Sequence, residues 1–255
     1  MSLKINPDTL NYAGAIHQLD PQTRTNGTLG SSCVEVFLHV IGNEHPEISC
    51  AKTTYSQSLT SDQDPYQEAV EEFKTDGSKT KLIVPIIIEG FNSIFVRNGG
   101  HLISVNDRID YLVRMIWHFL CGGSVENHIV MLTVSKKDND SYEVEYYDPK
   151  GRDISSSQII QYSKDTQNVE GVVNTVFNTL SEGNAKRVDL TYHNQGRLYS
   201  DQSIFNKVDC GYYVMQRAAE AAGRTDFGFT NIGDIADRAY AVIQQRPSSQ
   251  SMEAI

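Results

Sequence analysis

The sequence predicts an α+β fold with one dominant core, and three features support this. Apolar runs of strand length occur along the chain between segments of helical periodicity. The run 128–134 is nearly continuously apolar, as is typical of a central strand. The segment 142–147 alternates apolar and polar residues, as a hairpin partner of that strand would. A chain of 255 residues is long enough to bury a substantial core.

The first third of the chain gives weaker signals. Residues 1–30 are polar and rich in Thr, Asn and Gly, which favours an irregular lead-in. The short apolar segment 32–41 is compatible with a helix or a strand. Residues 50–78 resemble a surface insertion with one helical piece, 66–73. We therefore predict that residues 1–80 form a variable N-terminal extension, which could add substrate contacts.

The catalytic domain is predicted to span residues 81–245 and to be followed by a polar tail, 246–255. It opens with an apolar strand, 82–88, in which Pro85 favours a sheet edge or a bulge. Asn106 then caps an amphipathic helix that ends at about residue 121. Apolar residues on one face of this helix are Ile109, Leu112, Val113, Ile116, Phe119 and Leu120. The later elements are helix 169–180, strand 187–192, a helix from Cys210 to about Ala222, and helix 232–245.

Composition excludes several classes of function. The formal charge of -10 and a pI near 5.1 argue against broad binding to nucleic acids or to anionic membranes. The four cysteines contain no CxxC pair, and no His/Cys/Asp/Glu cluster has metal-ligand spacing. We expect free thiols and no metal or cofactor. The first twenty residues contain no apolar run of signal-peptide length, and no run reaches the roughly 18 residues of a membrane span, so an intracellular protein is expected. A monomer is the default expectation for its oligomeric state.

The most informative stretch is 209–215, where Cys210 stands directly before a glycine. Apolar residues at helical spacing follow it to about Ala222, and Gly223 provides a stop. Asp209 suits the N-cap position, which places Cys210 in the first helical turn. There the free N–H groups and the helix dipole favour a thiolate, which is the nucleophilic form of cysteine. A buried structural cysteine is the alternative interpretation, and we take Cys33, Cys50 and Cys121 in that sense.

Two further candidates lie at the ends of the predicted hairpin. His128 opens the first strand and Asp148 follows the second, and about six residues separate each of them from the turn at 136–141. Pairing of the strands would bring the imidazole beside the carboxylate. This is the arrangement of a Cys-His-Asp triad, in which the carboxylate orients the base. Gln202, eight residues before Cys210, could donate to an oxyanion.

Each of these residues also has an ordinary structural explanation. A lone histidine at a strand edge is often a satisfied core residue, and Asp148 opens an Asp-Pro-Lys-Gly turn in which it can cap its own backbone. Glutamines in a polar loop are usually solvated. His193 is a weaker base candidate, because the hairpin register gives it no acidic partner. The ordered set as a whole favours the triad.

The sequence also resembles a known family. The segments 127–132, 146–151 and 209–214 look like the histidine, aspartate and cysteine elements of the CE-clan ubiquitin-like-protein cysteine proteases. The resemblance covers about residues 81–223. Within the family, the sequence is most similar to the bacterial effector deubiquitinase branch. It implies a cysteine-protease fold, with a central mixed or antiparallel sheet flanked by helices and the catalytic cysteine at a helix N-terminus.

By this resemblance, His128 is the general base, Asp148 its orienting carboxylate, Cys210 the nucleophile and Gln202 the oxyanion donor. The sequence departs from the family in two places. Ile129 replaces the tryptophan that usually follows the histidine in eukaryotic members. Gln202 lies two residues farther from the cysteine than is usual, so Gln195 is a second candidate for the oxyanion donor.

The resemblance implies a thiol-dependent isopeptidase that cleaves after the C-terminal Gly-Gly of ubiquitin, or alternatively of SUMO or NEDD8. The acidic chain weakly favours the arginine-containing tail of ubiquitin. In the effector branch such a protein is secreted into the host cytoplasm. Two alternatives keep the fold: an effector acetyltransferase that uses acetyl-coenzyme A, and a pseudo-protease that binds ubiquitin without catalysis.

Overall fold

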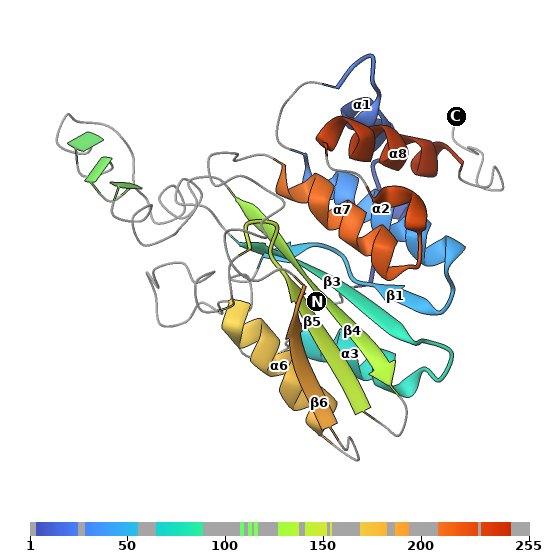
Figure 1. Cartoon of the computed structure of the whole chain (residues 1–255), viewed down its shortest axis with the longest axis vertical. Coiled ribbons are helices and arrows are strands. Elements are labelled where there is room, and N and C mark those ends of the chain that lie inside the picture. The colour runs from blue at the N-terminus through green and yellow to red at the C-terminus, as the bar shows by residue number, and fades with distance from the viewer. Residues whose placement is uncertain are drawn as a thin grey trace.

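The computed structural model describes residues 4–24, 29–55, 65–88, 127–137, 141–151, 169–182, 187–193, 209–228 and 231–245, together with residues 108–109, 112–113, 115–116 and 154. A single mixed sheet with helices on both faces organises these residues (Figure 1). The strands are β1 (Ile48–Cys50), β2 (Thr54–Tyr55), β3 (Lys81–Ile88), β4 (His128–Lys137), β5 (Ser141–Tyr147) and β6 (Arg187–Tyr192). The helices are α1 (Tyr12–Leu19), α2 (Ser31–Glu44), α3 (Pro65–Thr75), α6 (Val169–Ser181), α7 (Cys210–Ala221) and α8 (Ile232–Gln244), with short 3-10 helices η1 (Pro7–Thr9) and η3 (Thr225–Phe227).

The strands lie in the order β1-β3-β4-β5-β6, and β2 also pairs with β3. The centre is antiparallel, because β4 runs against both β3 and β5. The outer pairs are parallel: β1 and β2 with β3, and β6 with β5. This mixed sheet with flanking helices confirms the predicted fold class, and it places the hairpin β4–β5 near the middle of the molecule.

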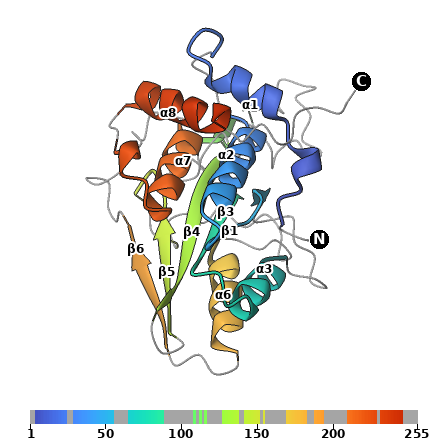
Figure 2. The same cartoon turned by 90° about the vertical axis from the view of Figure 1, so that its right-hand side faces the viewer.

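Each face of the sheet covers a separate hydrophobic core. Ile129 and Met131 of β4 pack with α1, α2, α7 and α8, whereas Val130, Leu132 and Val134 pack with α3 and α6. Figure 2 shows these two groups of helices on opposite sides of the strands. Successive side chains of a strand point to opposite faces, so a continuous apolar run is what a strand covered on both faces requires.

Pro85 lies inside the paired region of β3 rather than at its end. It stands opposite Met131 of β4. On the other side of β3, the pairing with β1 ends at Ile83 and the pairing with β2 begins at Ile86. Ala51 N–H donates to the Ile83 carbonyl, and alternate residues of a strand point the same way, so the ring nitrogen of Pro85 faces this interruption. The proline therefore costs the sheet no ladder hydrogen bond.

The N-terminal third is more ordered than the sequence indicated. The expectation of an irregular lead-in is wrong for residues 12–19, which form α1, and the ambiguous segment 32–41 lies within the helix α2. Side chains of α1 and α2 belong to the same hydrophobic core as those of α7 and α8. The interpretation of 50–78 as a surface insertion overlooked two short strands, because β1 ends at Cys50 and β2 pairs with β3. The functional division at residue 80 stays a prediction.

The predicted helix that begins near Asn106 is described only in part. The described residues between 108 and 116 are helical. Four of its predicted apolar residues are about half exposed among the described part of the chain: Ile109, Leu112, Val113 and Ile116. Phe119 and Leu120 lie outside the described residues.

Candidate active site

His128 and Asp148 form a buried pair at one end of the hairpin. The distance from His128 Nε2 to Asp148 Oδ1 is 2.7 Å. Neither side chain is more than 1% exposed. A buried imidazole–carboxylate contact of this length is a strong, charge-assisted hydrogen bond. The structure therefore brings together the two residues that the sequence placed at the open end of the hairpin.

The strand register that produces this contact differs from the predicted one. Tyr147 pairs with Met131, and Lys137 pairs with Ser141, so the hairpin turn is shorter than predicted. If this register is extended by one residue, Asp148 lies opposite Val130, two positions along β4 from His128. On its other side, His128 pairs with Ile88 of β3. The imidazole reaches Asp148 diagonally across the end of the hairpin.

The turn after β5 holds the carboxylate in place. Asp148 Oδ1 also accepts the backbone N–H of Lys150 at 2.7 Å. The Asp148 carbonyl accepts the N–H of Gly151 at 2.7 Å, which closes a β-turn. Gly151 has φ 66°, a left-handed conformation that favours glycine. The turn-capping role of Asp148 and its contact with His128 therefore coexist in one side chain.

This contact determines which ring nitrogen of His128 is basic. An ionised carboxylate can only accept, so the hydrogen bond to Asp148 assigns the ring proton to Nε2. The lone pair is then on Nδ1. A neutral imidazole held in this tautomer is suited to take a proton at Nδ1.

Cys210 is the first residue of α7, as the sequence predicted. Asp209 is the N-cap residue, although its side chain makes no capping hydrogen bond. Cys210 is 5% exposed and lies in the same core as Ile129, the residue after His128. Hydrogen bonds from the backbone of Ile129 and of Gly211 reach the sulfur. The nucleophile candidate is therefore held against the strand that begins with the base candidate.

Opposing effects act on the Cys210 thiol. Burial is the largest and raises its pKa, and the charge of Asp148 acts in the same direction. The two backbone hydrogen bonds and the charge of Lys150 lower the pKa. The net direction is upward, so the resting group is a thiol, and removal of its proton requires a base.

Lys150 is a functional candidate that the sequence analysis did not single out. It is only 9% exposed, and its charge acts on the Cys210 thiol. Lysine is rarely buried to this degree. Its place two residues after Asp148 in the turn was the only available signal, and a turn lysine is normally solvated.

A second polar cluster lies along α7. Glu145 of β5 accepts from Arg217 Nη2 at 2.5 Å and from Arg217 Nε at 3.2 Å. His193 Nδ1 lies 3.6 Å from the other oxygen of Glu145. The expectation that His193 has no acidic partner is therefore wrong. The reason is that β6 pairs in parallel with β5, which brings the end of β6 beside Glu145.

The two glutamines proposed for the oxyanion, Gln202 and Gln195, lie outside the described residues, as does Cys121. Cys33 and Cys50 are free, and burial raises the pKa of each thiol to about 12. Within the described ranges, no group of three or more His, Cys, Asp or Glu residues could hold a metal ion. No helix in that part of the chain is long and apolar enough to cross a membrane.

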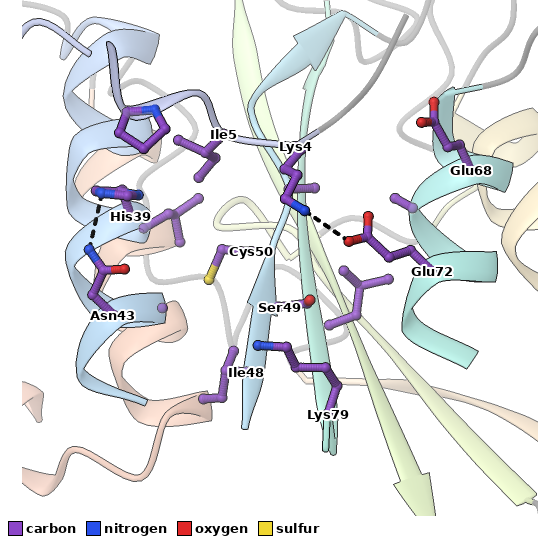
Figure 3. Close-up of a pocket in the computed structure, with 16 residues that line it drawn as sticks. Lys4, Ile5, His39, Asn43, Ile48, Ser49, Cys50, Glu68, Glu72 and Lys79 are labelled. Carbon is purple, nitrogen blue, oxygen red and sulfur yellow. Dashed lines mark hydrogen bonds and ion pairs between the residues drawn. The ribbon is translucent and has the colours of Figure 1, made fainter. Parts of the chain in front are cut away.

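A cavity of about 310 Å³ lies elsewhere, beside the edge strand β1 between α2 and α3 (Figure 3). Its lining combines apolar side chains with charged side chains of both signs. Lys4 and Glu72 form an ion pair across it at 3.1 Å, and Asn43 contacts His39 at 3.0 Å. None of the residues predicted for catalysis lines this cavity.

Searches for related proteins gave structural matches alone. No protein-family model and no curated protein matches the sequence. Similar solved structures include ChlaDub1 from Chlamydia trachomatis, with 11% identity, a TM-score of 0.47, and coverage of 88% of this chain and 96% of that one. A SUMO protease Ulp1 with its catalytic cysteine oxidised to a sulfonic acid has 13% identity, a TM-score of 0.45, and coverage of 91% and 83%.

The Legionella pneumophila effector protein RavZ, residues 1–487, has 10% identity, a TM-score of 0.41, and coverage of 86% of this chain and 67% of that one. The neighbours thus include a SUMO protease and bacterial effector proteins. Because all three TM-scores lie below 0.5, the function proposed next depends on the geometry of the site and on the sequence motifs.

Proposed function

We propose that this protein is a cysteine isopeptidase that cleaves after the C-terminal Gly-Gly of ubiquitin or of a ubiquitin-like protein. The observation that carries the proposal is the buried 2.7 Å contact between His128 and Asp148, with Cys210 in the same hydrophobic core as Ile129, the residue that follows His128, and at the start of a helix that contacts β4. A base, its orienting carboxylate and a thiol at a helix N-terminus are the parts that acyl transfer to cysteine needs.

In the proposed reaction, His128 Nδ1 takes the proton of the Cys210 thiol. The sulfur attacks the carbonyl carbon of the terminal glycine, and a carbon–sulfur bond forms. The imidazolium then returns the proton to the leaving lysine amine as the carbon–nitrogen bond breaks. Water, deprotonated by His128, hydrolyses the thioester and regenerates the thiol. Asp148 keeps the imidazole in the required tautomer and stabilises its charged form.

The tetrahedral intermediate needs donors for its oxyanion. The backbone N–H of Cys210 at the N-terminus of α7 is one candidate, since the first-turn N–H groups of a helix point at an anion placed there. Gln202 is the proposed side-chain donor, with Gln195 as the alternative. Lys150 adds a buried positive charge near the thiol.

The substrate class follows from the sequence motifs. Their resemblance to the CE clan implies a substrate tail that ends in Gly-Gly, and glycine is the residue that a narrow channel over a buried thiol admits. The acidic chain, with a formal charge of -10, favours a tail that carries arginines. We therefore propose ubiquitin ahead of SUMO and NEDD8, and a site of action in the cytoplasm of a host cell if the protein is a bacterial effector.

The test is the intact mass after incubation with ubiquitin, SUMO and NEDD8 that carry C-terminal electrophiles. We expect one adduct on the wild type, with the ubiquitin probe most reactive. The adduct should be absent in Cys210→Ala and strongly slowed in His128→Ala. Cys50→Ala, which removes another free thiol, is the matched control and should react like the wild type. A preference for SUMO would overturn the choice of ubiquitin, and an absence of adducts with all three probes would overturn the isopeptidase.

A further inference from the structure

We propose that the ion pair between Arg217 and Glu145 is a positioning device: α7 packs on β4, and the ion pair fixes its place relative to β5, and so the place of the Cys210 thiol relative to the His128–Asp148 pair. This inference rests on the proposed function. Neither residue touches the reacting atoms. Their proposed role is to hold the two elements that carry the nucleophile and the carboxylate in one fixed alignment.

The spacing along the two elements is matched. Arg217 follows Cys210 by seven residues, which is two turns on the same face of α7 and about 10 Å of helix. Glu145 precedes Asp148 by three residues, which is also about 10 Å of extended chain. The helix runs away from Cys210 and the strand runs toward Asp148. Contact at Arg217 and Glu145 therefore aligns the two catalytic ends.

The contact itself is specific and shielded. Arg217 Nη2 and Nε both donate to one oxygen of Glu145, at 2.5 Å and 3.2 Å, with side chains that are 18% and 24% exposed. Arg217 Nη1 also donates to Glu220 of the same helix at 3.1 Å. Arg217 thus donates two hydrogen bonds to one carboxylate oxygen and a third to a neighbouring residue of its own helix. A shift of α7 along the strand would break the bonds to Glu145.

His193 joins the cluster from a third element. Its Nδ1 lies 3.6 Å from Glu145 Oε2, and its ring packs edge to face against Tyr147, with centroids 5.5 Å apart. Its backbone N–H donates to Tyr146 of β5 at 3.0 Å. The Glu145 carboxylate thus contacts Arg217 of α7 through one oxygen and His193, the residue after β6, through the other. Although burial alone would raise its pKa, these partners lower it to about 2, so the group stays charged at working pH.

Other anchors of α7 lead to different elements. Lys81 at the start of β3 donates to the Ala221 carbonyl at 2.5 Å, which holds the C-terminal end of the helix. Arg224, beyond that end, contacts Glu44 of α2 at 2.7 Å. These contacts tie α7 to β3 and α2, whereas the Arg217–Glu145 pair ties it to the strand that ends at Asp148.

The closing experiment uses the full-length chain and separates positioning from folding. Variants Arg217→Met, Arg217→Lys and Glu145→Gln are compared with the wild type for kcat and KM on the modifier that the probes identify, well below each melting temperature. We expect Arg217→Met and Glu145→Gln to lower kcat by roughly 10- to 100-fold, since small misplacements of reacting groups are costly. KM should stay within about twofold, and Arg217→Lys should recover part of kcat.

The matched control is Arg187→Met, which breaks an exposed arginine–aspartate pair at 2.7 Å on β6. It should leave kcat unchanged. If Arg217→Met lowers the melting temperature while kcat remains at the wild-type value, the pair is structural only and the positioning role is overturned.

A second readout does not depend on the substrate. The rate of Cys210 alkylation by iodoacetamide is measured against pH by peptide mass, with His128→Ala as the reference that lacks the base. We expect the alkylation rate of Cys210 in Arg217→Met to depend on pH as it does in His128→Ala, because a displaced thiol is out of reach of the base. If the wild type and Arg217→Met share one profile that differs from that of His128→Ala, the positioning role is overturned while the triad stands. If all three profiles coincide, the proposed function fails first, because no base acts on the thiol, and the positioning role falls with it.

Discussion

At the scale of single residues, one turn supplies two influences of opposite sign on the same thiol. Asp148 raises the pKa of Cys210 and Lys150 lowers it, and only two positions separate them in the chain. Asp148 has a further duty, because its carboxylate holds His128 at 2.7 Å. The positive charge of Lys150 therefore opposes the rise in the Cys210 pKa that the Asp148 carboxylate causes, which favours the thiolate that must form for nucleophilic attack.

This arrangement predicts the effect of Lys150→Met, which keeps the length of the side chain and removes its charge. The pKa of the Cys210 thiol should rise, so the alkylation profile of Cys210 should move to higher pH. At any pH below that pKa, the alkylation rate should fall about tenfold each time the pKa rises by one. Iodoacetamide labelling of the folded protein between about pH 6 and pH 10 measures this effect as a lower rate at each pH below the pKa.

Lys137→Met serves as the control for that measurement. Lys137 lies at the far end of the same hairpin, where it is half exposed and pairs with Glu143. Its removal should leave the alkylation profile of Cys210 in place. An unchanged profile in Lys150→Met would mean that the lysine charge does not act on the thiol, and the electrostatic role would be withdrawn.

The residue scale is also where sequence reasoning was strongest. Cys210, His128 and Asp148 could be chosen because each has a local signal: a helix start, a strand start and a turn. Lys150 and Glu145 could not, because nothing local distinguishes a buried lysine in a turn or a partly buried glutamate in an alternating strand from solvated ones. Glu145 is paired with Arg217 of α7, which begins more than sixty residues later in the chain.

At the scale of elements, the hairpin and α7 explain how the site is assembled. The sequence predicted the strands β4 and β5 and their pairing, but placed the register two residues away from the one observed. The residues of a polar turn do not specify at which residue strand pairing stops. The predicted strands therefore ended too early on both sides of the turn, and the register was shifted. The contact with His128 survives because an imidazole is long enough to bridge two positions.

The start of α7 is held by a close approach at Gly211. A β-carbon built there would lie 3.0 Å from Leu29 Cδ2 and 3.2 Å from Leu29 Cβ. Alanine normally gains up to about 1 kcal/mol over glycine in a helix. Here we expect Gly211→Ala to lose stability by about 1–3 kcal/mol, because the added methyl overpacks a buried contact. Urea unfolding gives the free energy.

A double-mutant cycle isolates the contact. Leu29→Ala alone leaves a cavity and costs stability, but it should reduce the penalty of Gly211→Ala by about 1 kcal/mol, since the clash is gone. Gly77→Ala, where no atom lies within 4 Å of the added carbon, is the control and should stay within about 0.5 kcal/mol of the wild type. Strict additivity of the two substitutions would contradict the assignment of the penalty to Leu29.

At the scale of the whole molecule, the two cores have different sequence origins. The core between the sheet and α3 and α6 draws mainly on residues after 65, whereas the core around α7 also takes side chains from α1 and α2. The α+β class could be predicted, because strand and helix periods are local. The role of residues 12–44 could not, since their polar context hid a helix, α1, that is buried only on one side.

Glu145 and Arg217, like Phe37 and Phe227, show why such partnerships escape a sequence analysis. The rings of the two phenylalanines meet edge to face with centroids 5.6 Å apart, although 190 residues separate them in the chain. No local pattern in the sequence marks two residues so far apart as neighbours. Local patterns therefore locate the catalytic candidates, whereas the supports that hold them are visible only in the fold.

The last prediction concerns the boundary at residue 80. A fragment of residues 81–255 contains all the proposed catalytic residues but lacks α2, which places seven buried residues in the core around α7. It also lacks β1, and so exposes the edge of β3. We expect this fragment to unfold without a cooperative transition in urea, whereas the full chain unfolds cooperatively, because α7 loses the apolar side chains of α1 and α2 that share its core. Circular dichroism and the ubiquitin probe, applied to both proteins, measure folding and reactivity together. A fragment that unfolds cooperatively and still forms the Cys210 adduct would mean that residues 1–80 are an extension, and that the core around α7 is complete without α2.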